Sequence, residues 1–322
     1  MKVLSLFDGM SCGQIALNRL GIEYDTYYAS EIDKYAIQVA KKNYPNTIHI
    51  GDVTKVKAED IGEIDLLLGG SPCQGFSFAG HQLNFEDPRS KLFFEYVRLL
   101  NELKPKYFLL ENVKMKKESR DVISKYLGVE PIEINSSLVS AQKRSRLYWT
   151  NIPGIDQPKD KGILLRDILE GDVDPKYYAS KKFVDRINRY KNSDKCFDNS
   201  NKAMCLVSGY YKMGRDNTYI VENQSATSDG KSYCLTARYS GAVAWNSCER
   251  KQRTMIPTDI SDEVNPNIYN GVRYRKMTPV ECERLQTVPD NYTDCVSNTQ
   301  RYKMLGNGWT IDVITHILKN IL

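Results

Sequence analysis

Short apolar runs alternate with helical patterns along the first half of the chain. The runs predict strands at residues 3–7, 27–30, 65–68 and 107–110, and the helical periodicity predicts helices at 14–20, 33–44 and 92–103. Strands that alternate with helices form parallel β-α-β units, in which the helices cover both faces of one sheet. We therefore expect an α/β fold built on a doubly wound sheet.

This regular pattern breaks down after about residue 171 and returns near residue 275. The stretch between is rich in Tyr, Asn, Ser, Asp and Lys, with short strand-like pieces at 204–207 and 219–221. Beyond it, Thr278 and Glu281 form a predicted capping box, and a helix is predicted at 311–322. We expect a main domain at 1–171, a smaller irregular inserted domain at 172–274, and a segment at 275–322 that completes the main domain.

The composition is that of an ordinary globular protein. Its 322 residues are 41% hydrophobic and 26% charged, and no apolar run has the length needed to cross a membrane. An acidic residue, Asp8, comes too early for the apolar region of a signal peptide, so we expect a cytoplasmic protein. The eight cysteines include no C-x-x-C pair, which predicts reduced thiols and no metal site.

The net charge of +5 is compatible with a nucleic-acid partner without requiring one. Basic residues gather in the irregular stretch, for example at Lys181, Lys182 and Arg186. Taken alone, such a stretch is more often a solvated face than a binding site.

A glycine-rich turn at residues 7–13 follows the first predicted strand and opens a helix. Glycines let a backbone approach a ligand closely, and acids at the ends of the next strands, Glu31 and Asp52, suit ribose hydroxyls and an adenine amino group. This pattern favours an adenosine-containing ligand over a purely structural turn.

The turn also fits the nucleophile elbow of hydrolases, with Ser11 as nucleophile. That reading needs His49, His81 or His316 as a base, and none of them lies in a supporting motif.

A cysteine follows the strand at 65–68, in the sequence Ser-Pro-Cys-Gln-Gly around Cys73. Turn residues on both sides predict an exposed thiol at the sheet edge where ligands bind, and a thiolate there is a strong nucleophile. Its alternative is an ordinary loop cysteine.

Two further positions are candidates for contacts with a substrate. Glu111 ends the next strand, where a carboxyl among apolar residues could stay protonated and donate a hydrogen bond; its alternative is a helix cap. Arg144 and Arg146 lie two residues apart and share a face if extended, so either could bind a carbonyl or a phosphate. Their alternative is a surface strand with two solvated cations.

These motifs, in this order, resemble the DNA cytosine-5 methyltransferases. The set is FDGMSCG, SEID, GDV, GGSPCQGFS, LENV, QKRSR and LGNGWT, and it covers most of residues 1–155 and 275–322. The LFDG opening, SAQKRSRLYW and LGNGWT are especially similar to the animal de novo branch. The resemblance implies a Rossmann-like, class I methyltransferase fold, S-adenosyl-L-methionine as cofactor and double-stranded DNA as substrate. It also implies that residues 172–274 recognise the target, with a cognate restriction endonuclease as a candidate partner.

The resemblance also implies a role for each matching position. The implied catalytic residues are Cys73, Glu111, Arg144 and Arg146. The implied cofactor residues are Phe7, Asp8, Gly9, Ser11, Gly13, Glu31, Ile32, Asp52, Val53, Pro72, Asn307 and Gly308. Ile32 stands where the family often has an aromatic residue against the adenine. Three alternatives remain open: an RNA (tRNA) cytosine methyltransferase, a catalytically silent DNA-binding relative, and an adenine-amino methyltransferase, whose polar-Pro-Pro-aromatic motif is replaced here by Ser-Pro-Cys-Gln.

Overall fold

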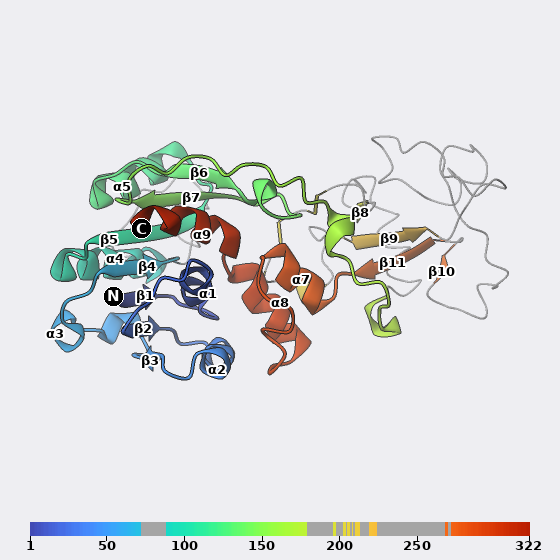
Figure 1. The fold of residues 1–322 in the computed structure, drawn as a ribbon, viewed down its shortest axis with the longest axis horizontal. Helices are drawn as coiled ribbons and strands as arrows, with labels where there is room; N and C mark the ends of the chain where they lie inside the picture. Colours follow the sequence, from blue (N-terminus) through green and yellow to red (C-terminus); the bar gives the residue numbers. More distant parts are fainter. Residues whose placement is uncertain are drawn as a thin grey trace.

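The computed structural model describes residues 1–71, 88–178, 196–197, 202–203, 205–206, 208, 210–212, 219–223, 268–269 and 272–322. Most of the described residues belong to a seven-stranded sheet and the helices that cover it (Figure 1). The predicted α/β class is confirmed.

The sheet has the strand order β3-β2-β1-β4-β5-β7-β6. Strands β1 to β5 run parallel to one another, whereas β7 is antiparallel to both β5 and β6. The antiparallel β7 was not predicted. The strand bounds are β1 Lys2–Leu6, β2 Thr26–Ser30, β3 Ile48–His49, β4 Leu66–Gly69, β5 Tyr107–Val113, β6 Ile132–Asn135 and β7 Ser145–Thr150.

Helices cover the sheet on both faces. Their bounds are α1 Cys12–Arg19, α2 Lys34–Asn43, α3 Ala58–Ile61, α4 Pro88–Leu103, α5 Lys117–Leu127, α7 Pro279–Leu285, α8 Asn298–Asn307 and α9 Ile311–Leu318. The predicted helices match α1, α2, α4, α7 and α9 to within a few residues, although the last one ends as α-helix at Leu318. No described helix is both long and apolar enough to cross a membrane.

Two hydrophobic cores lie on opposite faces of the sheet, because successive strand residues point to opposite sides. On β4, Leu66 and Leu68 join the core under α1 and α9, whereas Leu67 joins the core under α4 and α5. Helix α9 packs beside α1 although almost the whole chain separates them (Figure 1). The carboxyl-terminal segment therefore completes the main domain physically.

Helix α7 begins as the sequence predicts. The Thr278 hydroxyl accepts a hydrogen bond from the Glu281 N–H, the Glu281 carboxylate accepts one from the Thr278 N–H, and Pro279 takes the first helical position, which needs no donor.

A second, four-stranded sheet lies away from the first, at the other end of the molecule (Figure 1). Its strands are β8 Cys196–Phe197, β9 Tyr219–Asn223, β10 Ile268–Tyr269 and β11 Val272–Lys276. The predicted strand at 219–221 is confirmed in β9. The strand predicted at 204–207 is wrong for its described residues, Cys205 and Leu206, which instead pack on the main domain. The domain boundaries stay a prediction.

A buried ion pair joins the second sheet to helix α7. Arg275, in β11, donates two hydrogen bonds to the Glu281 carboxylate, at 2.8 and 2.9 Å, and both side chains are almost fully buried. Glu281 also accepts a hydrogen bond from the Glu170 N–H, on the chain that leads into the second sheet. Both connections between the sheets therefore converge on one carboxylate.

We expect Glu281→Gln to lower the free energy of unfolding by roughly 3–5 kcal/mol, because it removes the negative charge that the buried Arg275 guanidinium contacts. Denaturation in urea measures the change. Asp121→Asn, in the exposed pair with Arg120, is the matched control and should change it by less than about 1 kcal/mol. Equal effects of the two substitutions would contradict the role given to Glu281.

Candidate functional site

The predicted site residues gather at the carboxyl ends of the parallel strands. The first loop follows β1, Glu31 follows β2, Ser71 follows β4 and Glu111 lies near the end of β5. Open α/β sheets bind ligands at this edge. Pro72 and Cys73 lie outside the described residues, as do His81, Lys181, Lys182 and Arg186.

The first loop is held in an unusual backbone conformation. Phe7, Gly9 and Ser11 have φ angles of 58°, 59° and 66°, in the left-handed region that side-chain-bearing residues rarely adopt. The buried Asp8 carboxylate stabilises this loop by accepting hydrogen bonds from the Ser11 hydroxyl (2.5 Å) and the Tyr27 hydroxyl (2.9 Å). Asp8 and Ser11 therefore shape the loop from inside.

The hydrolase interpretation of this loop is wrong. Ser11 is fully buried, and its hydroxyl is engaged with Asp8 and with the Gln14 amide. A nucleophile elbow requires an exposed hydroxyl. His316 contacts Asp156 instead of a serine.

Gly13 has a packing role. A Cβ there would lie 2.6 Å from both a Leu68 methyl group and the Tyr27 hydroxyl. Only glycine lets α1 approach the sheet this closely, and that approach places the first loop over the ends of β1 and β4.

Glu31 links this loop to the end of β2. Its carboxylate accepts hydrogen bonds from the backbone N–H groups of Gly9, Ile32 and Asp33, each at 2.8 Å. A carboxylate has acceptor capacity beyond these three bonds, which suits ribose hydroxyls. The neighbouring Ile32 side chain is 77% exposed, a high value for a large apolar residue, and it offers a surface for a flat ring.

The next two predicted cofactor residues differ in exposure: Asp52 is partly exposed, whereas Val53 is buried. Asp52 caps the short helix η1 Val53–Lys55 and accepts hydrogen bonds from the N–H and hydroxyl of Thr54, which hold the pKa of Asp52 below its ordinary value. Val53 is 4% exposed and packs in the core beneath α4. Val53 therefore offers a ligand mainly its backbone, and its expected contact with the adenine stays a prediction.

Asn307 and Gly308 approach the first loop from the carboxyl-terminal segment. A Cβ on Gly308 would lie 3.0 Å from the Met10 side chain, so the two loops are in close contact. Tyr292 strengthens this contact by donating a hydrogen bond to the Met10 carbonyl at 2.7 Å. Asn307 itself is exposed. An acceptor carboxylate, an exposed apolar side chain and a close-packed glycine loop fit an adenosine-containing cofactor.

The chain that leads to Cys73 is fixed against β5. The Asn112 side-chain amide donates to the carbonyl and the hydroxyl of Ser71, at 3.3 and 3.2 Å. A Cβ on Gly70 would lie 2.9 Å from Nε1 of Trp309 and 3.4 Å from Oε2 of Glu111. The start of the cysteine loop therefore runs directly past the Glu111 carboxylate.

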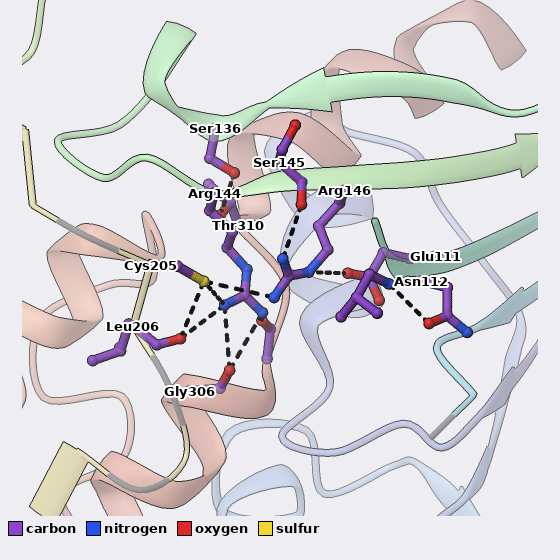
Figure 2. A network of polar contacts seen from close by, with 12 residues as sticks. Glu111, Asn112, Ser136, Arg144, Ser145, Arg146, Cys205, Leu206, Gly306 and Thr310 are labelled. Carbon is purple, nitrogen blue, oxygen red and sulfur yellow. Dashed lines mark hydrogen bonds and ion pairs between the residues drawn. The ribbon is translucent and has the colours of Figure 1, made fainter. Parts of the chain in front are cut away.

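Glu111 forms an ion pair with Arg146, with 3.0 Å between Oε1 and Nε (Figure 2). In the antiparallel β5–β7 register Arg146 lies opposite Val113, which makes it the diagonal neighbour of Glu111 on the same face. Burial alone would lower the pKa of Arg146, but the Glu111 carboxylate and Cys205 raise it. The helix-cap alternative for Glu111 is wrong, since the residue lies within a strand.

Arg144 is enclosed by backbone. It is 3% exposed and donates hydrogen bonds to the carbonyls of Leu206 (2.9 Å), Gly306 (3.3 Å) and Gly308 (2.9 Å). The alternative of two solvated cations is wrong for both arginines. These contacts fix Arg144 against the chain at Gly306 and Gly308, and the catalytic role that the resemblance implied stays a prediction.

Sequence reasoning missed three residues of the site: Asn112, Trp309 and Cys205. Asn112 and Trp309 stand inside the motifs LENV and LGNGWT, so their place beside named residues was a usable signal. Cys205 carried no such signal, because it lies in the irregular stretch. Within the described residues, no cluster of three His, Cys, Asp or Glu side chains could hold a metal ion.

We expect Asp8→Asn to change how stability depends on pH. Burial raises the pKa of Asp8 to about 6, from 3.8 in the unfolded chain. The folded state therefore holds a proton that the unfolded state has lost, and Asp8 makes the wild type less stable as pH rises from about 4 to 6, by up to about 3 kcal/mol. Urea denaturation at several pH values should show wild-type stability falling relative to Asp8→Asn over this window.

Asp52→Asn is the control for the direction in which stability changes with pH. The pKa of Asp52 is lowered, so any contribution from it grows as pH rises. A constant difference between wild type and Asp8→Asn from pH 4 to 6 would contradict the assignment.

Comparison with known proteins gives consistent matches along the whole chain. The profile of the family described as C-5 cytosine-specific DNA methylase matches residues 1–129 and 133–322. The type II methyltransferase M1.ScrFI of Lactococcus lactis subsp. cremoris is 32% identical, over 100% of this chain and 78% of its own length. M.HhaI of Haemophilus parahaemolyticus, also a type II methyltransferase, is 28% identical, over 100% and 94%.

Among solved structures, a mutant of Spodoptera frugiperda DNMT2 superimposes with a TM-score of 0.72. It is 22% identical and the alignment covers 99% of both chains. At that identity the match supports the fold alone, and it confirms the Rossmann-like, class I methyltransferase fold.

Proposed function

This chain belongs to the C-5 cytosine-specific DNA methylase family, and from that membership we propose that it methylates carbon 5 of a cytosine in a specific sequence of double-stranded DNA. The methyl donor is S-adenosyl-L-methionine, which supplies a methyl group bound to a sulfonium centre. The observation that carries the proposal is the Glu111–Arg146 pair, which lies beside the chain leading to Cys73.

The reaction needs a covalent step because carbon 5 of cytosine is a weak nucleophile. In our proposal the Cys73 thiolate bonds to carbon 6, which moves an electron pair towards carbon 5. Carbon 5 then bonds to the methyl group as the bond between that group and the sulfonium sulfur breaks, and S-adenosylhomocysteine would leave as the neutral thioether. Loss of its proton and elimination of the thiolate restore the aromatic ring and free the enzyme.

Glu111 and Arg146 stabilise the charge that this addition creates. Glu111 would hydrogen-bond the ring nitrogen N3 and the exocyclic amine, and Arg146 would bind the O2 carbonyl. Their ion pair holds both groups in a fixed arrangement before a base arrives. In that pair the Glu111 carboxylate can accept from the exocyclic amine, and it would take up a proton to donate to N3. The base must leave the duplex to reach them, at a cost of a few kcal/mol of unstacking.

The cofactor would lie across the first loop. Glu31 would hold the ribose, Ile32 and the backbone of Val53 would contact the adenine, and Asp52 would accept from its amino group. Asn307 and Gly308, with Pro72, would border the methionine end. Phe7, Gly9 and Gly13 form the loop that carries these contacts.

The second sheet and the irregular stretch around it would recognise the DNA sequence. We propose residues 172–274 for this role, with Lys181, Lys182 and Arg186 as phosphate contacts outside the described residues. The type II names of the relatives support a cognate restriction endonuclease as a candidate partner. We also propose a cytoplasmic place of action. We interpret the similarity of these motifs to the animal de novo branch as a sign that both carry out the same chemistry at this edge of the sheet.

Sequencing of bisulfite-treated DNA tests the proposal. Genomic DNA from cells that express the chain should carry 5-methylcytosine at one recurring sequence, and Cys73→Ser should reduce it to background, because a hydroxyl is far less nucleophilic than a thiolate. Cys295→Ser, at a partly buried thiol in the carboxyl-terminal segment, is the matched control and should methylate like wild type.

The same measurement separates the alternatives. If RNA of matched sequence were methylated and the DNA were not, the protein would be an RNA cytosine methyltransferase instead of a DNA methyltransferase. Loss of methylation in Cys295→Ser together with full activity in Cys73→Ser would show that the nucleophile is not Cys73.

A further inference from the structure

A short piece of the irregular stretch is bound to the arginine-bearing part of the main domain. We call residues 202–203 and 205–206 the docked segment. Ala203 donates its N–H to the Ala141 carbonyl (2.7 Å) and accepts from the Lys143 N–H (2.8 Å), so the segment pairs with the chain just before β7. Ala203 and Leu206 are buried in the core shared with α1 and α9.

The docked segment carries Cys205 into contact with both arginines (Figure 2). Its sulfur accepts hydrogen bonds from Nη1 of Arg144 at 3.2 Å and from Nη2 of Arg146 at 3.7 Å. The thiol in turn donates to the Leu206 carbonyl at 3.6 Å. One sulfur atom thus joins both guanidinium groups.

Three contacts orient the Arg146 guanidinium. Nε faces Glu111, Nη1 donates to the Ser145 carbonyl at 2.9 Å, and Nη2 faces Cys205. Glu111 and Ser145 belong to the seven-stranded sheet, whereas Cys205 comes from the irregular stretch. The third contact is therefore made only when the docked segment is seated.

Arg144 fixes the place of the sulfur. Its guanidinium is held by the carbonyls of Gly306 and Gly308, in the turn that also borders the first loop, and by the Leu206 carbonyl. Because Arg144 is enclosed in this way, Cys205 contacts a fixed guanidinium as well as that of Arg146.

We propose that Cys205 is a positioning residue for Arg146, through which the seating of the docked segment sets the orientation of that guanidinium towards the target base. This inference rests on the proposed function. A residue of the stretch proposed for DNA recognition, Cys205, would then also help to orient the reaction site.

Three substitutions test this role. Cys205→Val keeps an apolar side chain of similar size and removes the sulfur that accepts from the two arginines. Cys205→Ser keeps a side-chain atom that can both accept and donate a hydrogen bond. Cys295→Val is the matched control, since Cys295 is also a partly buried thiol, and its contact with Gln38 uses the backbone carbonyl.

The assay uses host genomic DNA and tritium-labelled S-adenosylmethionine, with single-turnover rates and cofactor affinity measured separately. We expect Cys205→Val to slow methyl transfer roughly tenfold, the order expected for losing one hydrogen bond to a charged group, with cofactor affinity unchanged. Cys205→Ser should stay within about threefold of wild type, and Cys295→Val should match it.

A double substitution separates positioning from a general effect on folding. If Cys205 acts through Arg146, Cys205→Val should cause no further loss in an Arg146→Gln background, because the group to be oriented is gone. A full tenfold loss in that background, or a wild-type rate in Cys205→Val alone, would overturn the inference while leaving the proposed function intact. An inactive wild type on the same DNA would instead overturn the proposed function and this inference with it.

Discussion

The contact between Glu111 and Arg146 depends on the antiparallel pairing of β5 with β7. If β7 ran parallel to β5, the two residues would not become diagonal neighbours. Antiparallel pairing sets a carboxylate and a guanidinium on one face at the sheet edge where ligands bind. The other features of the site are arranged around this pair: Gly70 and Trp309 on the side of Glu111, Cys205 and Arg144 on the side of Arg146.

Several residues at this edge shape loops and leave ligand contacts to their neighbours. Asp8 and Ser11 bond to each other inside the first loop, and the backbone of that loop is then held by Glu31. Arg144 similarly supports a turn through its carbonyl contacts. A motif can therefore contain residues that make the site rigid alongside those that face the ligand.

Sequence reasoning predicted the fold and much of the site because both depend on local signals. Alternating apolar runs located β1, β2, β4 and β5, and the capping box located the start of α7. The burial of Val53 and the enclosure of Arg144 depend on segments distant in the chain, so no local pattern could reveal them. The antiparallel β7 and the contact of Cys205 with both arginines have the same long-range origin, since residue spacing carries no information on which segment docks beside which.

The central claim is that a cysteine adds covalently to a flipped cytosine beside Glu111 and Arg146, and a trapping measurement tests it most directly. Duplex DNA should carry 5-fluorocytosine at the position that sequencing identifies as methylated. Fluorine cannot leave as a proton does, so the enzyme should remain bonded to the DNA when S-adenosylmethionine is present, as a complex stable in denaturing gels. Our account predicts this complex for the wild type and for Cys295→Ser, and its absence for Cys73→Ser. A complex formed by Cys73→Ser, or none formed by a wild type that methylates the same site, would contradict it.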